Sequence, residues 1–278
     1  SSTNTAEHNV ALGKTALDAV TTGDNNVAIG SGAMTSHTTG ASNVAIGYNA
    51  LEDNTTGSQN IAIGRDAFKD NVSGDRNIGI GYESLRSADT ESDNIAIGIS
   101  AMGSTSINGA EYNVALGNYS LDALTSGNNN IGIGHQALSA NTEGSRNVGI
   151  GYRALKTNTT THDNTAIGFE ALTSNLGDAN TAIGREALRS NNSGDYNSAI
   201  GSGALSGNTS GTRNIALGHG ALDIPDTEND NLAVGFEALG GTIAGGELNV
   251  AIGNYTLDAL TSGDGNTGIG YSSLSAVT

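Results

Sequence analysis

The chain alternates a short apolar segment with a polar, glycine-bearing segment, about once every seventeen residues. The apolar segment has the form Asn-aliphatic-Ala/Gly-aliphatic-Gly, as in "NVAIG" and "NIAIG". After two variable residues it is followed by a small residue and then usually a Leu. Large and small residues alternate within it, which is the period-two pattern of a β-strand. A fixed repeat of this length predicts a solenoid of stacked coils.

With the Asn as position 0, the motif occurs sixteen times, from Asn9 to Asn266, and twelve of the fifteen spacings are 17 residues. We therefore predict an all-β fold, a parallel β-solenoid (β-roll) of sixteen coils of about 17 residues. Two short strands are expected per coil, one at the motif and one around +7 and +8, with the +8 Leu inward. We expect the aliphatic residues at +1, +3 and +8 to be buried. The Ala or Gly at +2 would then suit a close three-fold axis, or equally a flat outer face that packs on another solenoid.

Two columns of the repeat predict backbone and side-chain geometry. Position +4 is Gly in all sixteen copies, which predicts a positive φ or a place where no Cβ fits. Identical Asn side chains in register can hydrogen-bond along a stack as a ladder. We predict this structural role, with ligand binding as the alternative, for Asn26, Asn43, Asn60, Asn77, Asn130 and Asn147.

Longer-range similarity divides the repeat array into blocks. Residues 1–278 read as a single solenoid domain with blocks 9–112, 113–248 and 249–278, and the last two blocks follow the lengthened turns "GSTSINGAEY" and "GGTIAGGEL". If residue 278 of one copy preceded residue 1 of another, the flanking motif Asn residues would be 21 residues apart. This spacing suggests that subunits stack end to end, or that the chain is a segment of a longer array.

Composition narrows the function classes. A net charge of −17 disfavours nucleic-acid binding, because phosphates would be repelled. The chain has no Cys, hence no disulfide or thiolate metal site, and no apolar run long enough for a membrane span. The five His are scattered and no catalytic motif is present, so we expect a non-enzyme without a cofactor. Ca²⁺ bound by acidic turns such as "DTESDN" is the one exception considered.

Aromatic residues gather at the variable positions +5 and +6. On a solenoid, residues of equal phase form one stripe, and exposed aromatic side chains suit glycan or protein contacts. The alternative is that they cover coil edges or make a contact between chains. The candidate ligand-binding residues are Tyr48, Tyr82, Tyr152, Phe169, Phe236 and Tyr271.

The segments "NVAIGYNAL", "NIAIGRDAF" and "NTAIGFEAL" resemble the head repeats of trimeric autotransporter adhesins. They are equally similar to repeats of phage tail fibres and surface fibres. The resemblance implies a left-handed parallel β-roll, often trimeric, in an elongated adhesive head or shaft. The period of 17 is longer than the usual unit of the adhesin head.

From these patterns we expect a structural, non-enzymatic fibre or filament protein, located outside the cell, on the cell surface or on a virion. Its partner would be itself, as an end-to-end filament or a homotrimer. The alternative is an adhesin or tail-fibre head or shaft that binds a surface glycan or receptor. A third possibility, an ice-binding surface, would need Thr in flat ranks, whereas the Thr residues are expected in turns and out of register.

Overall fold

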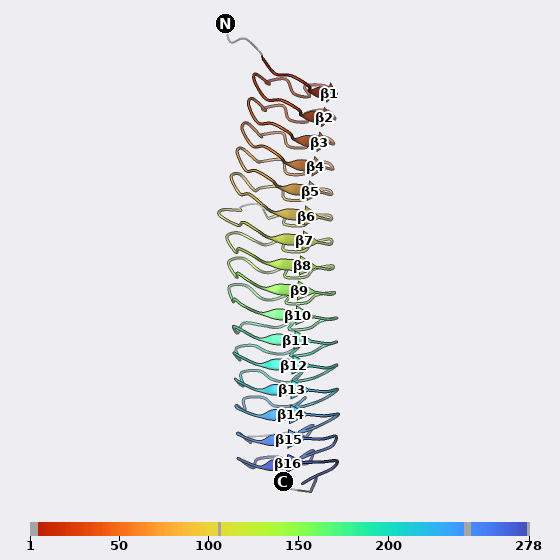
Figure 1. Ribbon diagram of the computed structural model, residues 1–278, viewed down its shortest axis with the longest axis vertical. Coiled ribbons are helices and arrows are strands. Elements are labelled where there is room, and N and C mark those ends of the chain that lie inside the picture. The colour runs from red at the N-terminus through yellow and green to blue at the C-terminus, as the bar shows by residue number, and fades with distance from the viewer. Residues whose placement is uncertain (1–4, 105–106, 242–245, 277–278) are drawn as a thin grey trace. The chain divides into compact units, whose positions relative to one another are not determined.

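The computed structural model describes residues 5–104, 107–241 and 246–276, and it comprises two compact units, Ser1–Gly144 and Ser145–Thr278. Each unit is a stack of coils in which every coil supplies one three-residue strand to a parallel sheet (Figure 1). The predicted all-β parallel solenoid with a 17-residue repeat is confirmed. The boundary between the units falls inside block 113–248, and the two lengthened turns lie partly outside the described residues. The single-domain organisation and the hand of the coil stay predictions.

In unit 1 the sheet order follows the chain. Its strands are β1 (Val10–Leu12), β2 (Val27–Ile29), β3 (Val44–Ile46), β4 (Ile61–Ile63), β5 (Ile78–Ile80), β6 (Ile95–Ile97), β7 (Val114–Leu116) and β8 (Ile131–Ile133).

Unit 2 repeats this arrangement. Its strands are β9 (Val148–Ile150), β10 (Thr165–Ile167), β11 (Thr181–Ile183), β12 (Ser198–Ile200), β13 (Ile215–Leu217), β14 (Leu232–Val234), β15 (Val250–Ile252) and β16 (Thr267–Ile269). Within each unit, every strand residue pairs with the residue at the same motif position in the next coil, as Val44 does with Ile61 and Thr165 with Thr181.

The small residue of each strand faces the core, and the large ones face outward. Ala45 and Ala62 at position +2 are fully buried. The residues at +1 and +3 of the same strands are half-buried or exposed. The expectation that +1 and +3 form the core and +2 an outer face is therefore wrong. The interior of the coil leaves little room for a side chain at +2. At Gly132, even an added Cβ would lie 2.5 Å from Oγ of Ser120.

The segment from +5 to +10 folds as turns, and the described residues contain no second strand per coil. Its residues at +6 and +8 have positive φ, as in Asn49 (52°) and Leu51 (54°), so the backbone curls instead of extending. The turns still bond between coils, since the Leu51 N–H donates to the Ala67 carbonyl at 3.1 Å. The second predicted strand is thus wrong, although the inward Leu is right, because Leu51 is fully buried.

The +4 glycines meet the first expected condition in every copy and the second inside the stack, whereas a Cβ on Gly270 in the last coil would meet no atom within 4 Å. Their φ lies between 117° and 142° in all sixteen copies, a region that L side chains rarely adopt. The next coil also lies too close for a side chain, since a Cβ on Gly47 would overlap the carbonyl oxygen of Gly64. The invariance of this column therefore follows from backbone conformation and coil spacing together.

Candidate functional site

The motif Asn residues form a buried column that links one coil to the next. The Asn43 N–H donates to Oδ1 of Asn26 at 2.9 Å, and Nδ2 of Asn43 donates to the carbonyl of Gly57 at 2.9 Å. Nδ2 of Asn43 also donates to Oδ1 of Asn26 at 3.1 Å, so the amides bond to one another and in addition satisfy backbone groups in the following coil. The structure places all six predicted residues in this column: Asn26, Asn43, Asn60, Asn77, Asn130 and Asn147.

A second buried polar column at +11 was missed by the sequence analysis. Here the side-chain amides bond directly to one another, as from Nδ2 of Asn71 to Oδ1 of Asn54 at 2.8 Å and from Nδ2 of Asn208 to Oδ1 of Asn191 at 2.8 Å. The signal was present, because Asn recurs at this position in "EDNTTG", "KDNVSG" and "SANTEG". Burial of both Asn columns leaves them closed to a ligand and assigns them to coil stacking.

His37 replaces Asn in this second column. Its Nδ1 accepts from Nδ2 of Asn54 at 2.9 Å, and its Nε2–H donates to the Gly40 carbonyl at 2.8 Å. Burial lowers the pKa of His37 below its ordinary value, against the opposing effect of these hydrogen bonds. The ring is therefore neutral at physiological pH and acts as part of the scaffold.

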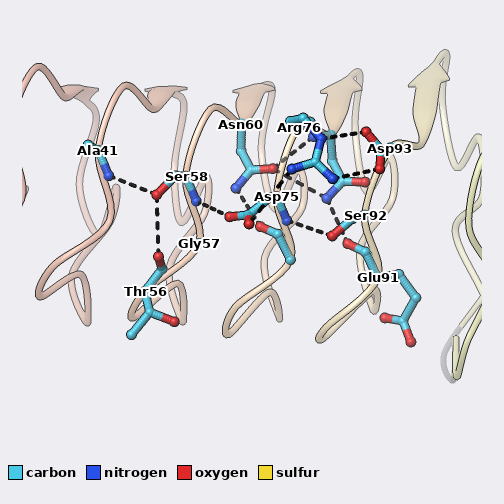
Figure 2. Close-up of polar contacts among 12 residues, drawn as sticks. Ala41, Thr56, Gly57, Ser58, Asn60, Asp75, Arg76, Glu91, Ser92 and Asp93 are labelled. Carbon is cyan, nitrogen blue, oxygen red and sulfur yellow. Dashed lines mark hydrogen bonds and ion pairs between the residues drawn. The ribbon is translucent and has the colours of Figure 1, made fainter.

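A third column lies two residues before each motif Asn and is partly open to solvent. Its side chains accept from the backbone N–H at the same position of the preceding coil, as Asp75 does from Ser58 at 2.7 Å and Ser92 from Asp75 at 3.0 Å (Figure 2). About 90% or more of buried backbone N–H and C=O groups in proteins have a hydrogen-bond partner, and this column supplies one for each of these N–H groups. Part of the acidic composition therefore serves backbone hydrogen bonding.

Beside this column, Arg side chains form two-bond ion pairs with Asp in the next coil. Arg76 contacts Asp93 through Nε and Nη2 at 2.6 and 2.7 Å (Figure 2). Arg146 with Asp163 repeats this geometry in unit 2. The Arg76 guanidinium holds the pKa of Asp93 below its ordinary value. These pairs fasten neighbouring coils together at the surface.

The aromatic stripe at +5 and +6 is exposed, and in unit 1 it interleaves with a cation. The strand ends at +3 and the +4 glycine turns the chain, so that the +5 side chain projects into solvent. The guanidinium of Arg65 lies 5.8 Å from the ring centroid of Tyr48 and 5.8 Å from that of Tyr82. The three side chains come from successive coils and form one continuous patch.

Unit 2 brings together the other four candidate residues in two groups. Tyr152 stacks on Phe169 with ring centroids 5.2 Å apart and an interplanar angle of 15°. Phe236 contacts His219 at 5.1 Å and Tyr255 at 5.4 Å. Tyr271 continues the second group, 5.9 Å from Tyr255. His219 occupies position +5 like Phe236 and lies within the stripe.

Carboxylates at +6 neutralise most of the stripe's cations. Arg65 pairs with Asp66 at 3.1 Å, and Arg185 pairs with Glu186 at 2.9 Å. Arg153 lies 4.9 Å over the Tyr152 ring and 3.6 Å from Glu170. The stripe therefore offers flat rings flanked by balanced charge. Such a surface suits stacking against sugar rings or apolar side chains better than binding a strongly charged ligand.

The acidic turns satisfy their own backbone. Oε2 of Glu91 accepts from the Thr90 N–H at 3.0 Å, and its Oε1 accepts from the Gly109 N–H at 2.7 Å. Within the described ranges, no group of three His, Cys, Asp or Glu side chains is placed to hold a metal ion. Ca²⁺ binding stays a prediction.

Thr residues are aligned in part of unit 1, contrary to the expectation that they fall out of register. Thr21, Thr38 and Thr55 occupy the same phase of successive coils, and Oγ1 of Thr38 donates to the Thr55 carbonyl at 2.9 Å. The hydroxyls of this rank bond to neighbouring coils. The rank therefore takes part in the stacking of the coils.

Comparison with family models, with curated proteins and with solved structures returns no match to this chain. In the part of the chain that the structure describes, no helix has the length and apolar character that a membrane crossing requires.

Proposed function

We propose that this chain is a structural, non-enzymatic component of an extracellular fibre or filament, in which coils of one copy stack on coils of another. The supporting observation is that the same bonds recur at each successive coil of a unit. They run through the motif Asn column, the strand and the turns. The proposed location outside the cell or on a virion follows from the resemblance of the repeats to adhesin and tail-fibre repeats.

The outer edges of β1 and β16 present backbone groups that bond to the next coil elsewhere in the stack, so the two edges are complementary. The Val10 N–H donates to the Asn26 carbonyl, so the N–H of Ala11 points to the other side of β1, because N–H groups alternate along a strand. The aliphatic side chains at position +3 of these edge strands are more exposed than those inside the stack. Leu12 is 67% exposed and Ile269 68%, against 36% for Ile46 inside the stack. Addition of a coil would cover both.

The interface between two copies would repeat internal bonds. The backbone N–H of Asn9 would donate to Oδ1 of Asn266 of another copy, as the Asn26 N–H donates to Oδ1 of Asn9 at 2.8 Å. The Glu7 carboxylate would accept from the Asp264 N–H, as Asp24 accepts from the Glu7 N–H at 2.7 Å. Such a head-to-tail contact is heterologous and continues as a filament unless its rotation closes a ring.

Electron microscopy of the purified chain over a concentration series tests this proposal. We expect particles that lengthen in steps of one subunit as concentration rises. Ala11→Pro removes the outward N–H of β1 and should stop growth, because proline on an edge strand blocks pairing. The matched control Ala11→Ser keeps the N–H and should grow like the wild type. Particles of constant length at every concentration would overturn the proposal.

A receptor- or glycan-binding adhesin head is the second candidate, favoured by the exposed aromatic stripe. Tyr152 and Phe169 are 37% and 46% exposed although their rings stack on each other. A glycan array probed with the wild type and with a Tyr48→Ser, Tyr82→Ser, Tyr152→Ser variant tests this function. Glycan binding that the three substitutions leave unchanged would remove it.

A further inference from the structure

One face of the sheet in unit 1 consists only of aliphatic side chains. It is formed by positions +1 and +3 of β1 to β8, here called the aliphatic face. Its residues are Val10, Leu12, Val27, Ile29, Val44, Ile46, Ile61, Ile63, Ile78, Ile80, Ile95, Ile97, Val114, Leu116, Ile131 and Ile133. Each of them is half-buried or exposed, whereas the intervening Ala or Gly of β2 to β8 is buried.

The face is continuous because the strands pair in register. Val27 lies beside Val44, and Ile63 beside Ile80, so like residues form two unbroken ranks. The chain has 28 acidic and 11 basic residues, and none of them interrupts these ranks. Exposed sheet faces of soluble monomers normally carry polar residues, and uninterrupted apolar patches mark interaction sites.

We propose that the aliphatic face of unit 1 packs against the same face of a second copy of this chain, sheet on sheet. Two flat faces pack at about 10 Å with their strands within about 30° of each other. A second copy supplies the same width, twist and 4.8 Å strand spacing, which an unrelated surface would have to match. This contact is lateral and goes beyond the end-to-end stacking proposed above.

The area is consistent with a reversible dimer. Eight strands at about 4.8 Å, each three residues long at about 3.3 Å, give roughly 400 Å² of face in plan. A pair of faces covers about 800 Å² in plan, and the relief of the side chains adds to the accessible area. That places the contact at the low end of specific interfaces, about 1,200 Å² or less, so we expect a concentration-dependent dimer.

The charges beside the aliphatic face would not strongly repel the same face of a second copy. The columns at −1 and +5, which flank the strands of unit 1, carry the cations Lys14, Arg65 and Arg76 and the single carboxylate of Asp93. Asp93 is paired with Arg76. Despite the net charge of −17 for the chain, this strip is not acidic. Too few cations flank it to attract an anionic membrane, where several clustered Lys or Arg are needed.

Unit 2 offers a matched comparison. In three consecutive strands its +1 rank is polar, with Thr165, Thr181 and Ser198 in place of Val or Ile. The +3 rank of the same strands is still Ile. The two units therefore present the same backbone arrangement with different outward chemistry, and we assign the contact to unit 1.

Sedimentation velocity of the full chain from about 1 to 200 µM tests the proposal. The triple variant Ile46→Thr, Ile63→Thr, Ile80→Thr keeps β-branched residues in the strands and should weaken dimerisation at least tenfold. The control Ile167→Thr, Ile183→Thr, Ile200→Thr makes the same change in unit 2 and should leave it unaltered. If the triple variant does not fold by circular dichroism, Ile63→Thr alone should shift the dimer in the same direction.

The Ala11→Pro variant separates the lateral contact from end-to-end growth. If the lateral contact exists, dimers remain in this variant after longer assemblies are lost. Loss of all association with Ala11→Pro would overturn the lateral contact while supporting end-to-end stacking. A wild-type chain that stays monomeric throughout, that binds zwitterionic vesicles instead, or that responds equally to the unit 1 and unit 2 variants would also overturn it.

Discussion

The carboxamide oxygen of Asn60 accepts a hydrogen bond from the backbone N–H of Asn77, one coil later, at 2.8 Å. The same side chain donates through Nδ2 to the Gly74 carbonyl at 2.7 Å. One residue therefore satisfies two backbone groups of the following coil. These groups are buried and have no water to bond to, so they need the Asn side chain as a partner. The column therefore fixes the register in which one coil stacks on the next.

Replacement of Asn60 by Ala should destabilise unit 1 by about 1–3 kcal/mol, because it leaves the buried Asn77 N–H without a partner. The Gly74 carbonyl loses its shorter bond and keeps the one from Nδ2 of Asn71 at 3.3 Å. Urea denaturation followed by circular dichroism measures the loss. Asn60→Asp keeps an acceptor but buries a carboxylate, so its cost should be larger at neutral pH than near pH 4, where a protonated carboxyl can donate to Gly74. A change below about 0.5 kcal/mol for Asn60→Ala would show that the column is not a source of stability.

Two glycines of one coil should differ strongly in how much stability a substitution costs. Gly201 at +4 has φ 139°, and a Cβ there would overlap the Gly218 carbonyl oxygen. Gly201→Ala should therefore cost about 3 kcal/mol or more. Gly203 has φ 70° with no atom within 4 Å of a Cβ, so Gly203→Asn should change stability by less than about 0.5 kcal/mol, since Asn tolerates this conformation. Thermal unfolding of both variants measures the contrast, and equal effects would contradict the account.

The narrow core should make neighbouring coils interdependent at one pair of residues. A Cβ on Gly132 would lie 2.5 Å from Oγ of Ser120, which donates to the Gly132 carbonyl at 2.8 Å. Gly132→Ala should thus destabilise unit 1 by about 1–3 kcal/mol. Ser120→Ala should relieve most of that loss, since Ala is the usual residue in both columns. A double-mutant cycle measures the coupling, and strictly additive effects would mean that the two residues do not touch.

The sequence was sufficient for the architecture because its strongest signals are periodic. The spacing of the motif Asn predicted the stack, and the unvaried +4 glycine predicted a special backbone conformation. Both signals depend on repetition, which a single sequence displays directly. The same periodicity placed Tyr48 and Tyr152 on an exposed stripe.

The errors concern which way side chains point. Ile46 was expected inside and Ala45 outside, because large apolar residues are usually buried. In a coil this narrow, the opposing Ala50 and Leu51 already fill the interior, so only a small residue fits on the inner side of the strand. Alternation along a strand gives two faces, and only the coil's width decides which one is inward. The prediction of a second strand was wrong because Leu51 has a positive φ, which the pattern of apolar and polar residues does not indicate.

His37 should make unit 1 sensitive to mild acid. Burial lowers its pKa in the folded chain below the ordinary value near 6.5, so its neutral form contributes stability that is present above pH 6.5 and lost as pH falls through the folded-state value. His37→Asn installs the residue found at the same phase in Asn54 and Asn71. Between pH 7.5 and 5.5 the wild type should lose stability relative to this variant, by up to about 1.4 kcal/mol per pH unit. Parallel pH profiles of the two would contradict the proposed neutral, buried ring.

The central claim is that the coils stack in register with Ala inward and Ile outward, and thiol labelling tests it most directly. The chain contains no Cys, so Ala182→Cys and Ile183→Cys each introduce a single thiol into β11 of unit 2. Ala182 is fully buried and Ile183 is 36% exposed. In folded, dilute protein, the thiol of the Ile183→Cys variant should react with a maleimide rapidly, and that of Ala182→Cys only after denaturation. Fast labelling of Ala182→Cys with protection of Ile183→Cys would contradict the account.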